Sequence, residues 1–247
     1  MTKQHTVLIT SALYSNYGIY SAQQRIAQTL ATAKSARAHI PNATIILIDN
    51  SKVDVQNDNS DEFNELLDIV DYYIDNSDDA DIQHFHNNVT NYDVGKNAME
   101  CLGMYKALTH ISADPELMNV ITTSSRIFKL SGRYVINKDF DINQFDNDNT
   151  IDKYVFKHAQ PGWIPVENIG VDQLYQTRLW AFTPSLFLDT IKLFDTIIRN
   201  MFTLFNQQKY IDVEHSMYKF LPKDRVVELD TVGLEGTIAP NGMKVSD

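Results

Sequence analysis

Two stretches of sequence decide the fold, VLITSAL at residues 7–13 and ATIILIDNS at residues 43–51. Each is almost continuously apolar and rich in β-branched residues, which is typical of a strand buried on both faces. Between them, Ser21 and Gln24 have the spacing of a capping box and predict a helix. Strand, helix and strand in this order form a βαβ unit with a right-handed crossover. Ser11 and Asp49 should therefore lie on the same edge of a parallel sheet, where open α/β sheets bind ligands.

The remaining chain repeats this alternation. Further helices are predicted at residues 62–71, 95–111, 184–205 and 212–220, and further strands at residues 72–75, 127–136, 179–182 and 226–229. The polar segments 53–61 and 76–93 and the tail 233–247 predict loops. Without an internal repeat or a linker, the sequence predicts a single α/β domain over residues 1–247. We expect a mostly parallel central sheet flanked by helices.

The amino-acid composition narrows the classes of partner that the protein could bind. The net charge of −11 and the pI near 5.0 argue against nucleic acid, because phosphate contacts need clustered Lys and Arg. A phosphate-bearing small ligand needs only one basic pocket. The single cysteine, Cys101, indicates a reducing compartment, and residues 1–6 lack the apolar core of a signal peptide. No apolar run reaches the roughly 18 residues of a membrane span. We therefore expect a cytoplasmic protein without a membrane span.

The stretch FKLSGRY, at residues 128–134, is the most informative for function. Lys129 and Arg133 flank a Ser131-Gly132 break in an apolar strand, where a glycine lets a backbone or a ligand approach closely. Two cations at this spacing could grip a diphosphate, and Arg does so with bidentate geometry. The alternative is an ordinary strand with Arg133 in a structural ion pair.

With this KLSGRY signature, the order of elements over residues 6–240 resembles GT-A-fold glycosyltransferases, in particular short bacterial and phage proteins. The resemblance implies a nucleotide-sugar donor, most simply a UDP-sugar, a carbohydrate or glycan acceptor, and a host cytoplasm if the protein is phage-encoded. Residues 6–136 would bind the donor and residues 137–247 the acceptor. The donor residues it implies are Thr10, Ser11, Ala12 and Asp49 for the base and ribose, Lys96 at a helix start for the phosphates, and Lys129, Ser131, Gly132, Arg133 and Tyr134.

The sequence departs from this family where GT-A enzymes carry Asp-x-Asp to hold a divalent cation. Ser131-Gly132-Arg133 occupies that place, and the fixed charge of Arg133 could stabilise the departing diphosphate instead. We therefore favour transfer that requires no cofactor. The alternative is Mn²⁺ or Mg²⁺ held by Asp139 and Asp141, although such matches arise easily in a chain with 32 acidic residues. His84 and His86 are a further possible metal pair, or simply part of a solvated loop.

Transfer with inversion needs a base for the acceptor hydroxyl. The resemblance places it at the start of a helix in the second half, where Glu214 is our first candidate and Asp212 the second. Acidic residues at a helix start also simply complement the helix dipole. His215 could orient the acid or bind the acceptor. Trp163, Trp180, Tyr134 and Tyr175 could form an aromatic platform for a sugar, with Trp163 on a loop and Trp180 in an apolar strand.

Three functions remain open. The first is a glycosyltransferase, and the second is a non-catalytic protein or degenerate transferase that binds a nucleotide or sugar. The third is another nucleotide-using enzyme, such as a nucleotidyltransferase, which would normally have a Gly-rich loop near the first strand. Residues 14–20 contain only Gly18, which counts against the third function.

Overall fold

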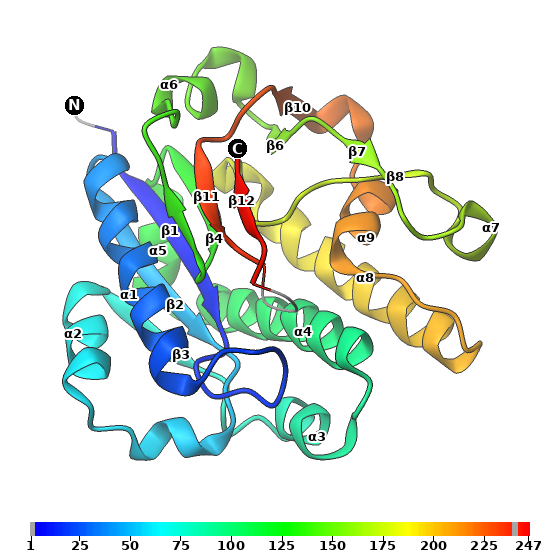
Figure 1. Cartoon of the computed structure of the whole chain (residues 1–247). Helices are drawn as coiled ribbons and strands as arrows, with labels where there is room; N and C mark the ends of the chain where they lie inside the picture. Colours follow the sequence, from blue (N-terminus) through cyan, green and yellow to red (C-terminus); the bar gives the residue numbers. More distant parts are fainter. Residues whose placement is uncertain (1–2, 239–241) are drawn as a thin grey trace.

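The computed structural model describes residues 3–238 and 242–247, so the expectations for residues 1–2 and 239–241 lie outside the described residues. The strands of its central sheet are β1 (His5–Ser11), β2 (Ala43–Asp49), β3 (Tyr72–Asp75), β4 (Arg126–Ser131), β6 (Tyr154–Lys157), β9 (Leu179–Phe182) and β10 (Val226–Leu229). They lie in the order β10-β6-β9-β4-β1-β2-β3 (Figure 1). Only the pairings of β9 with β4 and with β6 are antiparallel in this sheet. The predicted α/β fold with a mostly parallel sheet is confirmed.

Helices cover both faces of this sheet (Figure 1). The helices on one face are α1 (Ala22–His39) and α2 (Asp61–Ile69), and those on the other are α4 (Tyr92–Ala113), α5 (Pro115–Thr123), α8 (Phe187–Asn206) and α9 (Val213–Phe220). Because side chains alternate along a strand, Val7 and Ile9 of β1 pack toward α1 and Leu8 packs toward α4. Burial on both sides explains why β1 and β2 are continuously apolar in sequence.

Shorter elements complete the chain. A second sheet joins β5 (Tyr134–Ile136), β11 (Leu234–Thr237) and β12 (Lys244–Ser246), and a third joins β7 (Gln160–Pro161) and β8 (Gln173–Leu174). The remaining helices are α3 (Ala80–Asn88), α6 (Ile142–Phe145) and α7 (Val166–Ile169), with 3-10 turns η1 (Val53–Asn57), η2 (Asp148–Thr150), η3 (Pro184–Leu186) and η4 (Lys223–Arg225). Among the described residues, no helix combines the length and apolar character needed to cross a membrane.

The βαβ unit forms as predicted. Ser21 accepts a hydrogen bond from the backbone of Gln24, and Gln24 bonds back to Ser21, which closes the capping box of α1. In the register of the sheet, Ser11 pairs with Asp49 and Thr10 pairs with Ser131. The carboxyl ends of β1, β2 and β4 therefore meet on one edge of the sheet.

Four expectations about elements were wrong. The predicted loop 76–93 contains α3, and the predicted loop 53–61 contains η1. The predicted strand 127–136 does break at Ser131-Gly132, but its two halves lie in different sheets, because the N–H of Gly132 donates to the carbonyl of Thr10 and turns the chain out of β4. The tail carries β11 and β12, paired by backbone hydrogen bonds that its composition does not indicate.

Candidate active site

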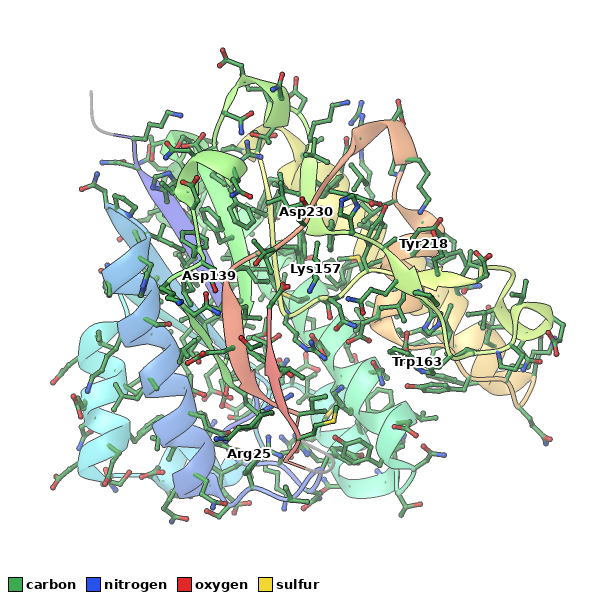
Figure 2. The ribbon with its side chains drawn as sticks, turned by 45° about the horizontal axis from the view of Figure 1, so that its top comes forward. Arg25, Asp139, Lys157, Trp163, Tyr218 and Asp230 are labelled. Carbon is green, nitrogen blue, oxygen red and sulfur yellow. The ribbon has the colours of Figure 1, made fainter. Side chains whose placement is uncertain are left out.

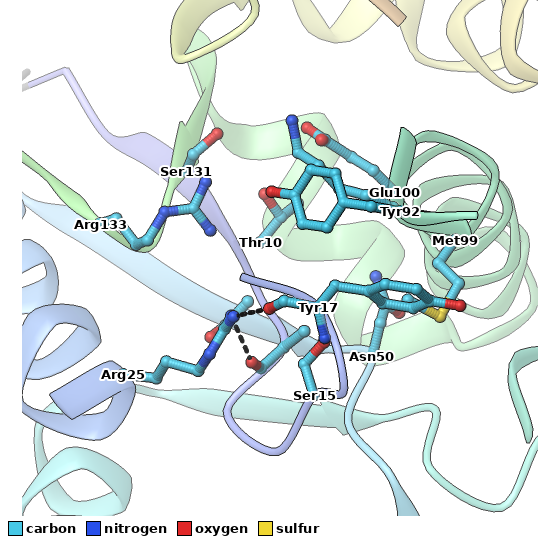
Figure 3. Close-up of a pocket in the computed structure, with 13 residues that line it drawn as sticks. Thr10, Ser15, Tyr17, Arg25, Asn50, Tyr92, Met99, Glu100, Ser131 and Arg133 are labelled. Carbon is cyan, nitrogen blue, oxygen red and sulfur yellow. Dashed lines mark hydrogen bonds between the residues drawn. The ribbon is translucent and has the colours of Figure 1, made fainter. Parts of the chain in front are cut away.

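A narrow pocket lies at the carboxyl ends of β1, β2 and β4, and we call it the inner pocket. It encloses about 80 Å³. Its lining comes from the strand ends and the loop after β1 (Thr10, Ser11, Ala12, Ser15, Tyr17, Asn50, Ser131 and Arg133), and from helices α1 and α4 (Arg25, Tyr92, Lys96, Met99 and Glu100). Figure 3 shows Arg133 on one side of the pocket and Tyr92 with Glu100 on the other.

A wider cavity of about 510 Å³, the outer cavity, adjoins the inner pocket. Its walls bring together α4, the β4–β5 turn, the loop after β7, the segment before β9 and the start of α9. The two spaces share a border formed by Tyr92, Lys96, Glu100, Ser131 and Arg133. The residues that line only the outer cavity include Tyr134, Trp163, Gln176, Thr177, Arg178, Tyr210, Asp212 and Glu214. A ligand could therefore extend from one space into the other across Arg133.

Arg133 is the cation that faces both spaces. Among the described residues its side chain makes no ion pair, and its Nε is buried without a hydrogen-bond partner. A buried donor without a partner is costly, so an anion placed here would satisfy it. Gly132 beside it is closely packed: a Cβ would lie 3.1 Å from the carbonyl oxygen of Thr10 and 3.0 Å from Oγ1 of Thr29.

Lys129 of the same signature lies elsewhere. Its Nζ donates to Glu100 Oε1 at 2.9 Å, to Ser131 Oγ at 2.8 Å and to the carbonyl of Thr177 at 3.0 Å. These bonds use all three N–H groups of the ammonium. Lys129 is buried and lines neither space, so the structure does not bring it to a ligand. The alternating side chains of β4 explain this, because Lys129 points to the face that α4 covers.

Charges alternate along the border. Lys129, Lys96 and Arg133 together overcome burial and lower the pKa of Glu100 to about 2. Burial lowers the pKa of Lys96, but Glu214 and Glu100 outweigh it and raise that pKa overall. The expectation that Lys96 opens a helix was wrong: α4 begins at Tyr92, capped by Asn91, and Lys96 lies one turn further on. It lines both spaces as a side chain, not through the helix end.

Glu214 lies in the first turn of α9 and lines the outer cavity. Its Oε1 accepts a hydrogen bond from Thr177 Oγ1 at 3.3 Å. Burial, together with Asp212 and Glu100, raises the pKa of Glu214 against the opposing effect of Lys96. A raised pKa makes a carboxylate a stronger base, and the position of Glu214 on the wall of a large cavity gives a ligand access to it.

Asp212 and His215 form a buried pair next to Glu214. Oδ1 of Asp212 accepts a hydrogen bond from the backbone N of His215 at 2.8 Å, and this bond caps α9. The same oxygen lies 2.7 Å from Nδ1 of the His215 ring. His215 has no exposed surface and lines neither space, so it orients Asp212. Its Nε2 is directed at Gly162, where a Cβ would lie only 2.6 Å away. The exposed ring of Trp163 packs edge-on to His215 with centroids 4.9 Å apart.

Other expected residues lie away from these spaces. Trp180 is completely buried between Phe156 and Phe182, so its ring offers no face to an acceptor. Tyr175 is also buried, whereas Trp163 and Tyr134 do line the outer cavity.

The expected metal residues line neither of the two spaces. Asp139 lines a surface depression beside β11, and Figure 2 shows it on a different part of the molecule from Trp163. Asp141 caps the short helix α6. The ring of His86 is buried and hydrogen-bonds with the carbonyl of Asn50. The ring of His84 instead lies beside Asn88 on the same helix, α3. Among the described residues, no group of three or more His, Cys, Asp or Glu could hold a metal ion.

Asp49 supports the inner pocket from beneath. It is fully buried, accepts from the backbone N of Leu13 at 3.0 Å, and does not line the pocket. The neighbouring Asn50 does line it. Arg25, which sequence reasoning missed, holds the same loop by donating to the carbonyls of Ala12 and Tyr17 (Figure 3). It also donates to the carbonyl of Tyr20. A lone arginine in a helix carries no motif, so only the fold reveals this contact.

No family model and no curated protein sequence matches the chain. Among solved structures it resembles the apo structure of the bifunctional glycosyltransferase WbbM, with a TM-score of 0.51, 10% identity and coverage of 93% of this chain. It thereby spans 39% of WbbM. It also matches the galactosyltransferase LgtC in complex with donor and acceptor sugar analogs (TM-score 0.46, 13% identity, 91% of this chain and 73% of that chain). A third match is 4-diphosphocytidyl-2C-methyl-D-erythritol synthase from Anaerococcus prevotii (TM-score 0.42, 15% identity, 93% and 91%). The likeness to WbbM shows that the fold is of the GT-A type.

Proposed function

We propose that this protein is a glycosyltransferase that moves a sugar from a nucleoside-diphosphate donor to an acceptor hydroxyl. The observation that carries the proposal is the position of Arg133 at the border of two connected spaces. The inner pocket would take the nucleoside, between Tyr17, Asn50 and Met99. The outer cavity would take the transferred sugar and the acceptor. The diphosphate would then lie against Arg133 and Lys96.

Glu214 is the proposed base. Its carboxylate accepts the proton of the acceptor hydroxyl as that oxygen forms a bond to the anomeric carbon. The bond between the anomeric carbon and the diphosphate oxygen breaks, and the electron pair leaves with the nucleoside diphosphate. Because the charge develops on that oxygen, a fixed cation beside it lowers the barrier. We assign this part to Arg133, and Lys96, which also lines both spaces, adds a second positive charge.

Metal-independent transfer is part of the proposal. Arg133 follows directly after Ser131 and Gly132 at the end of β4, and its side chain has no protein acceptor among the described residues. An arginine without a protein acceptor can neutralise the charge of a diphosphate without a bridging cation.

The test is calorimetric titration with uridine, UDP, GDP and CDP, each with EDTA and with Mn²⁺. We expect one diphosphate to bind equally well in EDTA. Arg133→Gln should lower the affinity for UDP, or for whichever diphosphate binds, by about 10–100-fold. The affinity for the corresponding nucleoside should stay unchanged. Arg199→Gln, an exposed arginine paired with Asp195 on α8, is the matched control and should bind as the parent protein does.

Three results would contradict parts of the proposal. Binding that appears only with Mn²⁺ removes metal independence. An Arg133→Gln protein with full diphosphate affinity removes the role of Arg133. Tight donor binding without any donor turnover supports a non-catalytic nucleotide-binding protein.

A further inference from the structure

Arg178 is a second arginine whose side chain is left free at the site. The chain has seven arginines, and within the described residues only the side chains of Arg133 and Arg178 have neither an ion pair nor a hydrogen bond to a protein acceptor. The other five bond to carbonyls, hydroxyls or carboxylates. An arginine without a partner in a half-buried position is available for an anionic ligand.

The backbone and the aromatic ring of Tyr134 fix Arg178 in place. Its carbonyl accepts from the backbone N of Ser131 at 2.9 Å, which ties it to the end of β4. Its guanidinium lies over the ring of Tyr134, 5.4 Å from the ring centroid. Stacking of this kind occupies the face of the guanidinium and leaves its in-plane N–H groups free for a planar or tetrahedral oxyanion.

Arg178 lies on the acceptor side of the site. Arg133 lines both spaces, whereas Arg178 lines the outer cavity and a smaller depression beside Gln160 and Gln176, but not the inner pocket. A donor that extends from the inner pocket reaches Arg133 first. Arg178 is therefore left for whatever enters the outer cavity from solvent.

The walls of the outer cavity carry opposite charges. Arg133 and Arg178 come from the β4–β5 turn and the segment before β9. The other wall, from α4 and the start of α9, carries the lysine Lys96 among the acidic residues Asp93, Glu100, Asp212 and Glu214, so acidic side chains predominate on it. An acceptor with an anionic end is repelled by the carboxylate wall and attracted to Arg178. That orientation directs its remaining hydroxyls toward Glu214.

We infer that the acceptor carries an oxyanion, a carboxylate or a phosphate, and that Arg178 binds it. Arg178 thereby selects an anionic acceptor over a neutral one of the same shape. The inference rests on the proposed function, because it names the class of acceptor for that same site.

The experiment measures binding of three sugar ligands to the whole chain with UDP at saturation, so that the diphosphate already occupies Arg133. The ligands are methyl β-glucuronide, glucose 6-phosphate and the neutral methyl β-glucoside. We expect at least one anionic ligand to bind about tenfold or more tightly than the neutral glycoside. The glucuronide arm reports a carboxylate acceptor, and the glucose 6-phosphate arm reports a phosphate acceptor.

Variants separate Arg178 from a general charge effect. Arg178→Gln should abolish the preference for the anion and leave UDP affinity unchanged, and Arg178→Lys should retain part of the preference. Arg199→Gln changes the net charge equally on an exposed face of α8 and should retain the full preference. Thermal unfolding of Arg178→Gln should lie close to that of the parent, since the substitution removes the stacking on Tyr134 but no hydrogen bond or ion pair of the side chain.

Each other outcome overturns the inference. It fails if neither anionic ligand binds measurably, if the preference survives in Arg178→Gln, or if that variant loses UDP affinity, which would place Arg178 on the donor. If none of UDP, GDP and CDP binds, the proposed function fails. The same comparison made without UDP then still decides whether Arg178 selects an anion.

Discussion

The inner pocket and the outer cavity adjoin each other but are built differently. The ends of three long strands, with α1 and α4, form the inner pocket, and all of its residues lie within the first 133. The outer cavity needs short elements from residues 163–238 as well. At the inner pocket, Arg25 lines the wall and Asp49 and Lys129 lie behind it, and protein partners satisfy all three side chains. On the walls of the outer cavity, Arg133 and Arg178 are not satisfied in this way.

This difference separates residues that hold the site from residues that act in it. A polar group whose hydrogen bonds are complete contributes to the fold, and breaking its bonds costs stability. A group left without a partner in a cavity has capacity for a ligand. The following predictions test whether the two kinds of residue behave differently when they are changed.

Glu214→Gln should give the largest effect. We expect the rate of donor turnover with a saturating acceptor to fall by about 10²–10⁴-fold, because the glutamine cannot accept the proton. UDP affinity and thermal stability should stay close to those of the parent, since glutamine can still accept the hydrogen bond from Thr177. The measurement is release of UDP from a UDP-sugar.

Asp212→Asn is the paired variant for this prediction. Asparagine is as good a helix cap as aspartate, so α9 should stay intact. Full turnover in Glu214→Gln together with a large loss in Asp212→Asn would transfer the role of base to Asp212.

Lys129→Met should instead reduce stability. It leaves the carboxylate of Glu100 partly buried without its closest cation, so we expect a loss of about 3–5 kcal/mol in the free energy of unfolding. The double variant Lys129→Met, Glu100→Gln should recover much of this loss, because it removes the uncompensated charge. Urea denaturation measures both. A stable Lys129→Met protein that no longer binds UDP would show that Lys129 grips the diphosphate.

The parts of the fold that sequence reasoning predicted correctly are those fixed by local pattern. β1, β2, β3, β9 and β10 are apolar runs with clear ends, and α1 has its capping box. The segment at 137–174 remained unassigned because β6, β7, β8, α6 and α7 are at most four residues long. Elements this short are set by tertiary contacts and carry no measurable periodicity.

The candidate site divides in the same way. Sequence placed Thr10, Ser11, Ala12 and Arg133 at the sheet edge because strand ends are predictable. It could not separate Lys129 from Arg133, since that depends on which residue of α4 lies opposite β4. One available signal was the alternation along β4, which directs Lys129 toward the helix layer that contains Glu100. No sequence pattern marked Arg178 as a binding residue. Its guanidinium is available to a ligand because, among the described residues, the fold places no hydrogen-bond or ion-pair partner beside it.

Asp49 provides the smallest expected effect and a direct test of the inner region. Burial raises the pKa of Asp49 from its ordinary 3.8 to about 6, despite the hydrogen bond from Leu13. Between those two values the folded protein binds more protons at this group than the unfolded chain does. The contribution of Asp49 to stability is therefore present below about pH 4 and is lost as the pH rises to about 6.

Asp49→Asn should remove that pH dependence, because asparagine stays neutral and its carbonyl oxygen can still accept from Leu13. Between pH 4 and pH 7 the variant should gain up to about 3 kcal/mol in the free energy of unfolding relative to the parent protein. Urea denaturation across this range measures the gain, and Asp139→Asn is the control, since that carboxylate is exposed. Parallel pH profiles of stability for Asp49→Asn and the parent would show that burial does not raise the pKa of Asp49. A loss of UDP affinity in Asp49→Asn would instead give Asp49 the contact with the base or ribose that the family resemblance implies, and the inner region would then hold an acting residue as well.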